Sequence, residues 1–340
     1  MRRRQFMRAS GLALGAMLLL AFVGAGHAAE VTLRLGLSSF NTHPYNLAAE
    51  RYRKKVAELS HGAIDIKIFP NRQLGGVKEL TEGVRFGTVD MTINSSSAMA
   101  DLIPAIDALQ LPFLFNSYAD FAKMAVTPEA EALSAGLAKK GAIALAIYEG
   151  GERHFLTVKR EIKTIDDFKG LKTRVAPVRL HLDIWRAMGT NPTPMAYGEV
   201  YTALETGTID AVETNISSVL NEKYSEVAKH MLLDGHYFWP GLLMINKARF
   251  DKLKPEYQAI LRKAARETVE PQIMALDAYD RNAMEVLKKK GVEFTTASPE
   301  LLAAMRKKVE PVYAAYMKKD PAITPFVKRA KELQTAAKSN

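Results

Sequence analysis

The chain contains no cysteine among its 340 residues, and this absence excludes several classes of protein. Without thiols there is no iron–sulfur cluster, zinc ribbon, thiol nucleophile or haem-attachment motif. A lipid-anchored bacterial lipoprotein is excluded too, because the residue that carries its lipid is a cysteine. Disulfides are not needed for stability, since 48% of the residues are hydrophobic and a chain of this length can bury a large core. The length favours two domains.

Motifs of the common enzymes are missing as well. The sequence has no Gly-x-Ser-x-Gly elbow, no His-Glu-x-x-His, no Walker loop and no Gly-x-Gly-x-x-Gly. Its seven histidines include no pair spaced four residues apart. Together these absences weigh against a hydrolase, an ATPase or a metalloenzyme, and we expect no metal site and no cofactor.

The first 28 residues have the pattern of an export signal. Residues 1–8 contain four arginines and no acid, an apolar run follows over about 12–23, and small residues lead to Ala28. This order is typical of a secretory signal peptide, and the run is shorter than the roughly 20 residues that span a membrane. The run Arg3-Arg4-Gln5-Phe6-Met7 also resembles the twin-arginine signature, so both export routes remain open. We therefore expect a periplasmic protein that begins near Ala29.

The charge of the chain does not indicate a nucleic-acid partner. The formal net charge of +10 includes the four arginines of the export signal. The other basic residues lie on helix-like segments among acids, which is typical of solvated surfaces. No basic stripe is interleaved with aromatic residues, so we expect no nucleic-acid binding.

The first part of the mature chain predicts a β-α-β-α-β unit. Apolar residues alternate over 31–37 and 64–68, and a third strand is expected over 89–93. Helical periodicity marks 44–59, which begins at a proline, and 77–86, which ends at a glycine. Such a unit forms a parallel sheet with right-handed crossovers, and ligands bind beyond the carboxyl ends of its strands.

A second unit repeats a turn of the first. Strands are expected over 142–148 and 170–175, with helices near 178–188 and 198–206. The sequence Gly87-Thr88-Val89-Asp90 recurs as Gly207-Thr208-Ile209-Asp210, each time between a helix and a strand with a polar far end. The glycines suit left-handed helix ends, and the aspartates can bond locally, so we expect both turns to be structural. Two similar α/β lobes would direct their polar strand ends at one cleft.

A long helical pattern follows over about 253–290. Pro255 begins it, Gly291 ends it, and Pro271 in its middle should kink it. At 1.5 Å per residue it would be about 50 Å long, which exceeds one small domain. We expect this helix to span both lobes.

Two arginines of the second unit are candidates for ligand binding. Arg174 lies in an otherwise apolar strand, and Arg153 follows Gly150-Gly151 where the chain should cross between lobes. A guanidinium is always charged and holds a carboxylate with two parallel hydrogen bonds. The alternative for either arginine is an internal salt bridge to Glu152, Asp166 or Glu213.

Several strings resemble the substrate-binding proteins of tripartite ATP-independent periplasmic (TRAP) transporters. They are "FPNRQLGGVKELTEGVRFGTVDM", "LQLPFLF", "GERHFLTVKREIKTIDDFKGLKTRV" and "PTPMAYGEVYTALETGTIDAVE". The resemblance implies an α/β, two-lobed periplasmic-binding-protein-like fold, with two mixed or parallel sheets flanked by helices. It implies a protein without catalysis that delivers a carboxylate to a membrane permease driven by an ion gradient. The expected lobes are 29–151 with about 240–279, and 152–239 with about 280–340.

The resemblance also assigns roles in the second lobe. The arginine of the family's "GLK-x-RV" strand clamps the substrate carboxylate and is Arg174 here, while that of the "G-x-R" turn is Arg153, a second contact or an orienter. The aromatic residue after "PMA" often lies against the ligand and is Tyr197 here, with a place in the lobe core as the alternative.

A further expected contact follows the second glycine turn. The family commonly has a Glu and then a polar group that faces the cleft, and the Glu is Glu213 here. Some members have Asn directly after it, whereas this chain has Thr214 and then Asn215, so either residue is a candidate.

Four more candidates come from strand ends and crossings. Ser38 and Ser95 follow strands of the first lobe, and His43 is either a donor to the ligand or a helix cap. Trp239, in "HYFWPGLLMIN", is either an aromatic wall for the ligand or a hinge residue, whereas Trp185 is expected in the core.

We therefore predict a solute-binding protein for an organic acid, with sugar acids and hydroxy acids mildly favoured. The alternatives are a periplasmic lyase or isomerase that uses Glu213 and Arg174, and the receptor of an ATP-driven importer.

Overall fold

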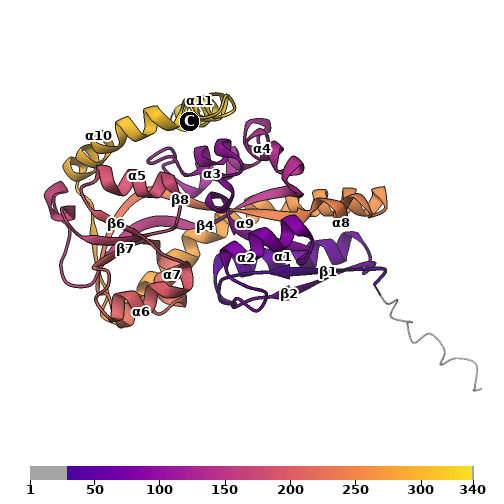
Figure 1. Cartoon of the computed structure of the whole chain (residues 1–340), viewed down its shortest axis with the longest axis horizontal. Coiled ribbons are helices and arrows are strands. Elements are labelled where there is room, and N and C mark those ends of the chain that lie inside the picture. The colour runs from indigo at the N-terminus through magenta and orange to yellow at the C-terminus, as the bar shows by residue number, and fades with distance from the viewer. Residues whose placement is uncertain (1–28, 339–340) are drawn as a thin grey trace, which may run out of the picture.

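The computed structural model describes residues 29–338, so the expected export signal lies outside the described residues. Figure 1 shows a mixed α/β molecule in which β1 and β2 lie beside α1 and α2 in the first lobe. The elements of this part are β1 (Val31–Gly36), α1 (Pro44–Leu59), β2 (Ile64–Phe69), α2 (Val77–Phe86) and β3 (Met91–Ser95). Since β1 pairs in parallel with both β2 and β3, the predicted β-α-β-α-β unit is confirmed.

The second lobe has the same plan. Its elements are β5 (Lys172–Val175), α5 (Arg179–Ala187), β6 (Asn191–Pro194), α6 (Val200–Glu205), β7 (Ala211–Asn215) and α7 (Ile216–Asn221). Here β5 pairs in parallel with β6 and β7. Trp185 is fully buried and stacks on Phe155 at a centroid distance of 4.7 Å, which confirms its predicted place in the core.

Two long strands run through both lobes. They are β4 (Ala142–Thr157) and β8 (His230–Asn246), which are antiparallel to each other. In the first lobe β8 pairs with β3, and in the second lobe β4 pairs with β7. The two predicted sheets are therefore joined into one sheet of nine strands, with β9 (Glu293–Thr296) beside β8. The sequence conceals this continuity, because Gly150-Gly151 looks like a strand end, and the pairing register does shift there.

The long helix α9 (Pro255–Lys289) lies along both lobes as predicted, with Pro271 inside it. In its first half the Thr268 hydroxyl bonds to the Tyr148 hydroxyl of β4 at 2.7 Å. In its second half the Tyr279 hydroxyl donates to the Thr42 carbonyl of the first lobe and accepts from the Asn221 amide of the second. The helix is therefore a common brace for both lobes.

Five further helices complete the described chain. They are α3 (Tyr118–Ala125), α4 (Pro128–Ser134), α8 (Lys247–Asp251), α10 (Pro299–Tyr316) and α11 (Ile323–Lys338). Helix α10 packs on the second lobe, where the Tyr316 hydroxyl donates to Asp183 of α5 at 3.0 Å. The expected second lobe also included α11. In the structure, however, Phe326 of α11 packs against Phe115 of the first lobe, and the Gln334 amide donates to the Leu114 carbonyl. The last helix therefore returns to the first lobe.

The repeated glycine turn has the predicted structural role. Gly87 and Gly207 have left-handed φ angles of 84° and 70°. The Asp90 carboxylate accepts from the main-chain N–H of Arg34 in β1, and the Asp210 carboxylate accepts from that of Lys172 in β5, at 2.8 and 2.9 Å. Each aspartate thus fastens the turn to the central strand of its own lobe.

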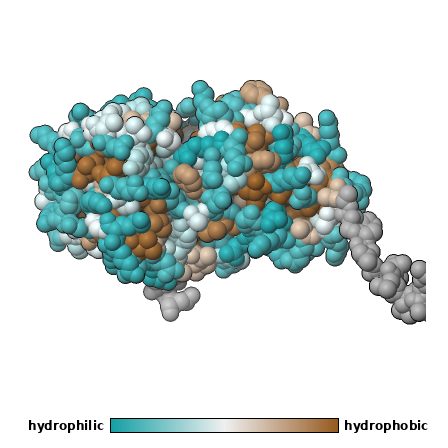
Figure 2. Space-filling model, turned by 90° about the horizontal axis from the view of Figure 1, so that it is seen from below, coloured by the Kyte–Doolittle hydropathy of each residue, from teal (hydrophilic) through white to brown (hydrophobic). Residues whose placement is uncertain are grey.

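The surface in Figure 2 is mainly hydrophilic, with separate apolar patches. Among the described residues, no helix is both long and apolar enough to cross a membrane.

Candidate ligand-binding site

The predicted site residues come together where the two lobes meet. Trp239 of β8 donates from Nε1 to Ser95 Oγ at the end of β3, at 2.7 Å. Its ring lies 4.6 Å from the Arg153 guanidinium of β4 and 5.8 Å from the Tyr197 ring of the second lobe. Trp239 therefore contacts residues of both lobes. We call the following group the interlobe site: His43, Arg153, Arg174, Tyr197, Glu213 and Trp239.

Arg153 is neutralised within the protein. Its Nε and Nη2 both donate to Glu213 Oε2, at 2.7 and 2.5 Å, and Nη2 also donates to the Glu213 carbonyl. Both side chains are buried. Burial alone would raise the pKa of Glu213, but the Arg153 guanidinium and two nearby histidines outweigh it and hold that pKa well below its usual range. The alternative of an internal salt bridge, with Glu213 as the partner, is the arrangement found here.

Arg174 is buried without such a partner. Its Nε and Nη2 donate to the Met195 carbonyl at 3.1 and 2.8 Å, and among the described residues no carboxylate forms an ion pair with it. The side chain is 4% exposed, and burial lowers the pKa of its guanidinium. A guanidinium stays charged near neutral pH even so, and a buried unpaired charge is costly. The site therefore holds one buried arginine that has no ion-pair partner among the described residues.

Aromatic rings surround Trp239 at the meeting point of the lobes. Trp239 is partly exposed, while His43, Tyr45 and Tyr197 around it are buried. The ring centroids of these three lie 5.6 to 5.9 Å from that of Trp239. The Tyr197 hydroxyl bonds to Ser218 Oγ at 2.9 Å, which fixes the ring.

His43 combines the two roles that the sequence left open. As the N-cap of α1 it accepts a hydrogen bond on Nδ1 from the Tyr45 main-chain N–H at 3.2 Å. Burial lowers the pKa of His43 to about 3, so the ring is neutral and its proton lies on Nε2. Nε2 is buried and has no partner among the described residues. An unused donor is therefore fixed beside Trp239.

Of the remaining predicted residues, Ser95 and Asn215 form side-chain hydrogen bonds within the protein, whereas Ser38 forms none among the described residues. Ser95 Oγ is shared between Trp239 and Ser97, and Ser38 is buried with no side-chain hydrogen bond to another described residue. The Asn215 amide donates to the Gly150 carbonyl and to Ser217, and its oxygen accepts from Ser218 at 2.6 Å.

Thr214 and Asn215 are the two candidates for the polar group after Glu213. Side chains alternate along a strand, so Thr214 of β7 lies on the face opposite Glu213 and Asn215. Thr214 is buried, and Asn215 lies on the Arg153 side with its amide bonded to β4 and α7. Asn215 therefore ties the second lobe to the crossing strand.

Sequence reasoning missed Glu149, which lies at the crossing of both long strands. Its Oε1 accepts from the main-chain N–H groups of Gly150, Gly151 and Trp239, at 2.8 to 3.0 Å. Burial raises the pKa of Glu149 despite these three bonds. A carboxyl group directly before two glycines in an apolar strand was the available signal, because its oxygens can accept from several main-chain N–H groups at once.

A second missed feature is an ion pair between the lobes. Arg72 Nη2 of the first lobe lies 3.0 Å from Glu222 Oε2 at the end of α7. The guanidinium also lies 5.2 Å from the Tyr197 ring. The other oxygen of Glu222 is buried without a partner among the described residues, and burial raises the pKa of this carboxyl group. The sequence shows no local sign of this pair, since 150 residues separate its members.

Behind Arg153 lies a buried charge network. His236 Nδ1 is 2.9 Å from the Asp234 carboxylate, which raises the pKa of His236 against the effect of burial. His236 Nε2 is 3.9 Å from Glu213 Oε2. No group of His, Asp and Glu among the residues from 29 to 338 has an arrangement that would hold a metal ion.

Two α/β lobes joined by crossing strands in one sheet are described above, and comparison with known proteins gives the family. The model of the bacterial extracellular solute-binding protein family 7 matches residues 37–320. The chain therefore belongs to this family.

Relatives and solved structures agree with this assignment. The 2,3-diketo-L-gulonate-binding periplasmic protein YiaO of Escherichia coli is 36% identical over 278 residues, which cover 82% of this chain and 84% of that protein. The sugar acid binding protein of Advenella mimigardefordensis, in complex with galactonate, has a TM-score of 0.85 at 28% identity and covers 90% of this chain and 99% of its own. A TRAP periplasmic solute-binding protein of Bradyrhizobium, in complex with galacturonate, has a TM-score of 0.83 at 32% identity, over 88% and 99% of the two chains.

The chain is therefore a periplasmic solute-binding protein that captures an organic acid and delivers it to a TRAP permease. The predicted family, localisation and partner class are confirmed. The rival receptor of an ATP-driven importer is not supported by these relatives.

Proposed function

We propose that the ligand is a sugar acid whose carboxylate pairs with Arg174. The observation that carries this proposal is the contrast at the interlobe site, where Arg153 has a carboxylate partner and Arg174 has none. A ligand carboxylate would supply the missing negative charge through charge-assisted hydrogen bonds. In this scheme Arg153 does not clamp the acid, but holds Glu213 and supports the Trp239 ring.

Polar groups where the two lobes meet suit a polyhydroxylated ligand. The unused Nε2–H of His43 can donate to a hydroxyl or carboxylate oxygen, and the unpartnered Glu222 oxygen can accept from a hydroxyl. The Trp239 ring offers an apolar surface for the carbon face of a sugar. Relatives with comparable folds were solved with galactonate, galacturonate and glucuronate, which are all acids of this kind.

Closure of the lobes would then couple binding to delivery. We propose that the lobes are 29–151 with about 240–279, and 152–239 with about 280–322, with α11 assigned to the first lobe. Contacts across them include Arg72 with Glu222 and Thr42 with Asn221. The ligand favours the closed form because it adds contacts to both lobes, and exclusion of water strengthens the charge-assisted bonds. The Glu149 carboxyl group bonds to main-chain groups of both crossing strands, so they bend together as one hinge.

We further propose that the solute is released unchanged. The predicted rival, a lyase or isomerase, would use Glu213 as a base. Glu213 is poorly suited to this role, because two short bonds to Arg153 lower its pKa and occupy one of its oxygens.

A thermal-shift screen against uronates, aldonates, dicarboxylates and keto acids tests the proposal. Binding stabilises the fold by RT ln(1 + [L]/Kd), which is about 4 kcal/mol at a thousand times Kd. We expect uronates or aldonates to raise the melting temperature of the mature protein but not that of Arg174→Met. A larger shift with dicarboxylates would contradict the sugar acid, and an equal shift in the variant would contradict the clamp. NMR of the incubated hit would show new signals only if the protein were an enzyme.

A further inference from the structure

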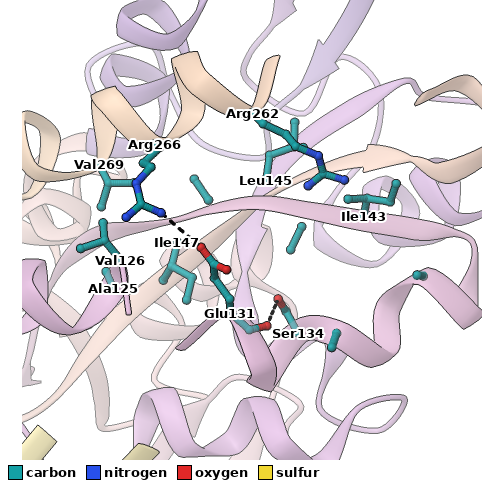
Figure 3. Close-up of a pocket in the computed structure, with 14 residues that line it drawn as sticks. Ala125, Val126, Glu131, Ser134, Ile143, Leu145, Ile147, Arg262, Arg266 and Val269 are labelled. Carbon is teal, nitrogen blue, oxygen red and sulfur yellow. Dashed lines mark hydrogen bonds and ion pairs between the residues drawn. The ribbon is translucent and has the colours of Figure 1, made fainter. Parts of the chain in front are cut away.

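A groove on the first lobe lies far from Arg174 in the fold and is not used by the proposed ligand. It has a volume of about 440 Å³ and runs along β4 between α9 and the segment formed by α4 and the short 3₁₀ helix Ala135–Lys140. Figure 3 shows Arg262 and Arg266 reaching over β4 from α9, with Glu131 and Ser134 on the other side. We call this feature the β4 groove.

The lining shows that the groove exposes the edge of β4 and not one of its faces. Five consecutive residues, 143–147, line it, whereas a face would contribute only every second residue. In this stretch β4 pairs with β8 on one side, and β7 joins its other side only from Arg153 onward. The edge over 143–147 therefore has no strand beside it among the described residues. Unpaired edges of this kind accept an added strand.

Glu149, two residues further along β4, shows how a partner can bond to this edge. The side-chain amide of Gln272, from α9, donates to the Glu149 carbonyl at 2.8 Å and accepts from the Glu149 main-chain N–H at 3.0 Å. These are the two bonds that a neighbouring strand would make. The edge is thus filled by a side chain at residue 149 and left open directly before it.

The charge around the groove indicates the chemistry of a partner. Arg262 is exposed and, among the described residues, has only the Phe250 ring as a partner, at 4.8 Å. Arg266 pairs with Glu131 at 3.6 Å, with 69% of each side chain exposed. Exposed pairs of this kind contribute little to stability, so an incoming carboxylate can displace Glu131. A second copy of this chain, paired through the same edge, would bring like charges together.

We propose that the β4 groove is the docking surface for an extended, acidic segment of the membrane permease, which adds to β4 as a strand. Apolar side chains of the segment would pack between α4 and α9, and its acids would pair with Arg262 and Arg266. The docked strand would end beside Glu149, next to the hinge. This inference rests on delivery to a TRAP permease, and it names the surface by which delivery occurs.

The test combines charge reversal with uptake by the reconstituted permease. We expect Arg262→Glu/Arg266→Glu to lower ligand uptake into proteoliposomes by roughly tenfold or more, because both anchoring charges are reversed. Calorimetry of the same variant should give the wild-type affinity for the ligand. The matched control is Lys263→Glu, an exposed charge on the same helix outside the groove, which should leave uptake unchanged.

Two direct measurements complete the test. A photo-crosslinking residue at Ala135, which lines the groove, should couple to the permease, whereas one at the exposed Ala132 of the same segment should not. Amide hydrogen exchange over 143–147 should slow when the permease is added. Normal uptake by the double variant, crosslinks only to a second copy of the chain, or unchanged exchange would each overturn the proposal. If the wild-type protein itself did not bind a sugar acid in calorimetry, that result would instead count against the proposed function.

Discussion

Arg153 and Arg174 lie on strands of the same lobe, and both are almost completely buried, yet their surroundings differ. Arg153 has the Glu213 carboxylate on one side and the Trp239 ring on the other. Arg174 has only a main-chain carbonyl oxygen. Because a carboxylate cancels the charge and a carbonyl does not, we propose that the first arginine stabilises the empty protein and that the second is left for the ligand. Burial alone therefore does not distinguish the two candidate arginines, whereas the missing counter-charge does.

The largest expected effect is on the unpaired arginine. Arg174→Met should weaken ligand binding by about 3–5 kcal/mol, which is several hundred-fold or more, because the ligand carboxylate would be buried without a counter-charge. The free energy of unfolding of the empty variant should stay the same or rise, since a costly charge is removed. Calorimetry and urea unfolding measure the two quantities. A large loss of stability with full affinity would reverse the assignment of the two arginines.

The paired arginine should show the opposite pattern. Arg153→Met leaves Glu213 buried without its main partner and should lower the free energy of unfolding by about 3–5 kcal/mol. The double variant Arg153→Met/Glu213→Gln removes both charges and should recover most of this loss. Urea unfolding of the two single variants and the double variant gives the coupling. If the losses of the two single variants add up in the double variant, Arg153 and Glu213 do not neutralise each other, and the contrast with Arg174 fails.

A smaller effect is expected at the uncharged donor. His43→Asn keeps an acceptor for the Tyr45 N–H at the helix start but removes the Nε2–H, so it should weaken ligand binding by about 1 kcal/mol, or roughly fivefold. His43→Ala removes the cap as well and should be less stable than His43→Asn by about 1 kcal/mol. Calorimetry and thermal unfolding separate the two roles. Equal ligand affinity in the wild type and His43→Asn would leave only the capping role.

A pH-dependent effect is expected at a buried acid, which can avoid an unpaired charge by keeping its proton. Burial raises the pKa of Asp280 on α9 to about 7, against roughly 4 in the unfolded chain. Between these values the folded state binds more protons, so the contribution of Asp280 to stability is lost as the pH rises from about 4 to 7. Asp280→Asn should fall less in stability over this window than the wild type, whereas the exposed Asp277→Asn should follow the wild type. Urea unfolding at pH 4.5 and 7.5 measures the difference.

The parts of this molecule that the sequence predicts are those set by local patterns. The β-α-β-α-β unit follows from alternation and helical periodicity, and the two glycine turns follow from the φ angles that glycine permits. Arg174 stands out because a charge in an apolar strand needs a reason. These features are encoded within a few neighbouring residues.

The features that the sequence conceals depend on contacts between distant segments. Which arginine is neutralised is decided by Glu213, 60 residues from Arg153. The Asn215 amide bonds to the Gly150 carbonyl only because β4 pairs with β7, and Arg72 meets Glu222 only because the two lobes pack against each other. Residue type and spacing give the candidates, but their partners are fixed by tertiary packing.

The position of Trp239 also gives the protein a spectroscopic property. The chain has two tryptophans, and Trp185 is fully buried in the second lobe, whereas Trp239 is partly exposed between the lobes against a guanidinium and a hydroxyl. A solute that enters beside Trp239 changes the polarity around one indole and leaves the other as an internal reference. Intrinsic fluorescence therefore offers a label-free reporter of solute capture, with the emission of a Trp239→Phe variant as its baseline.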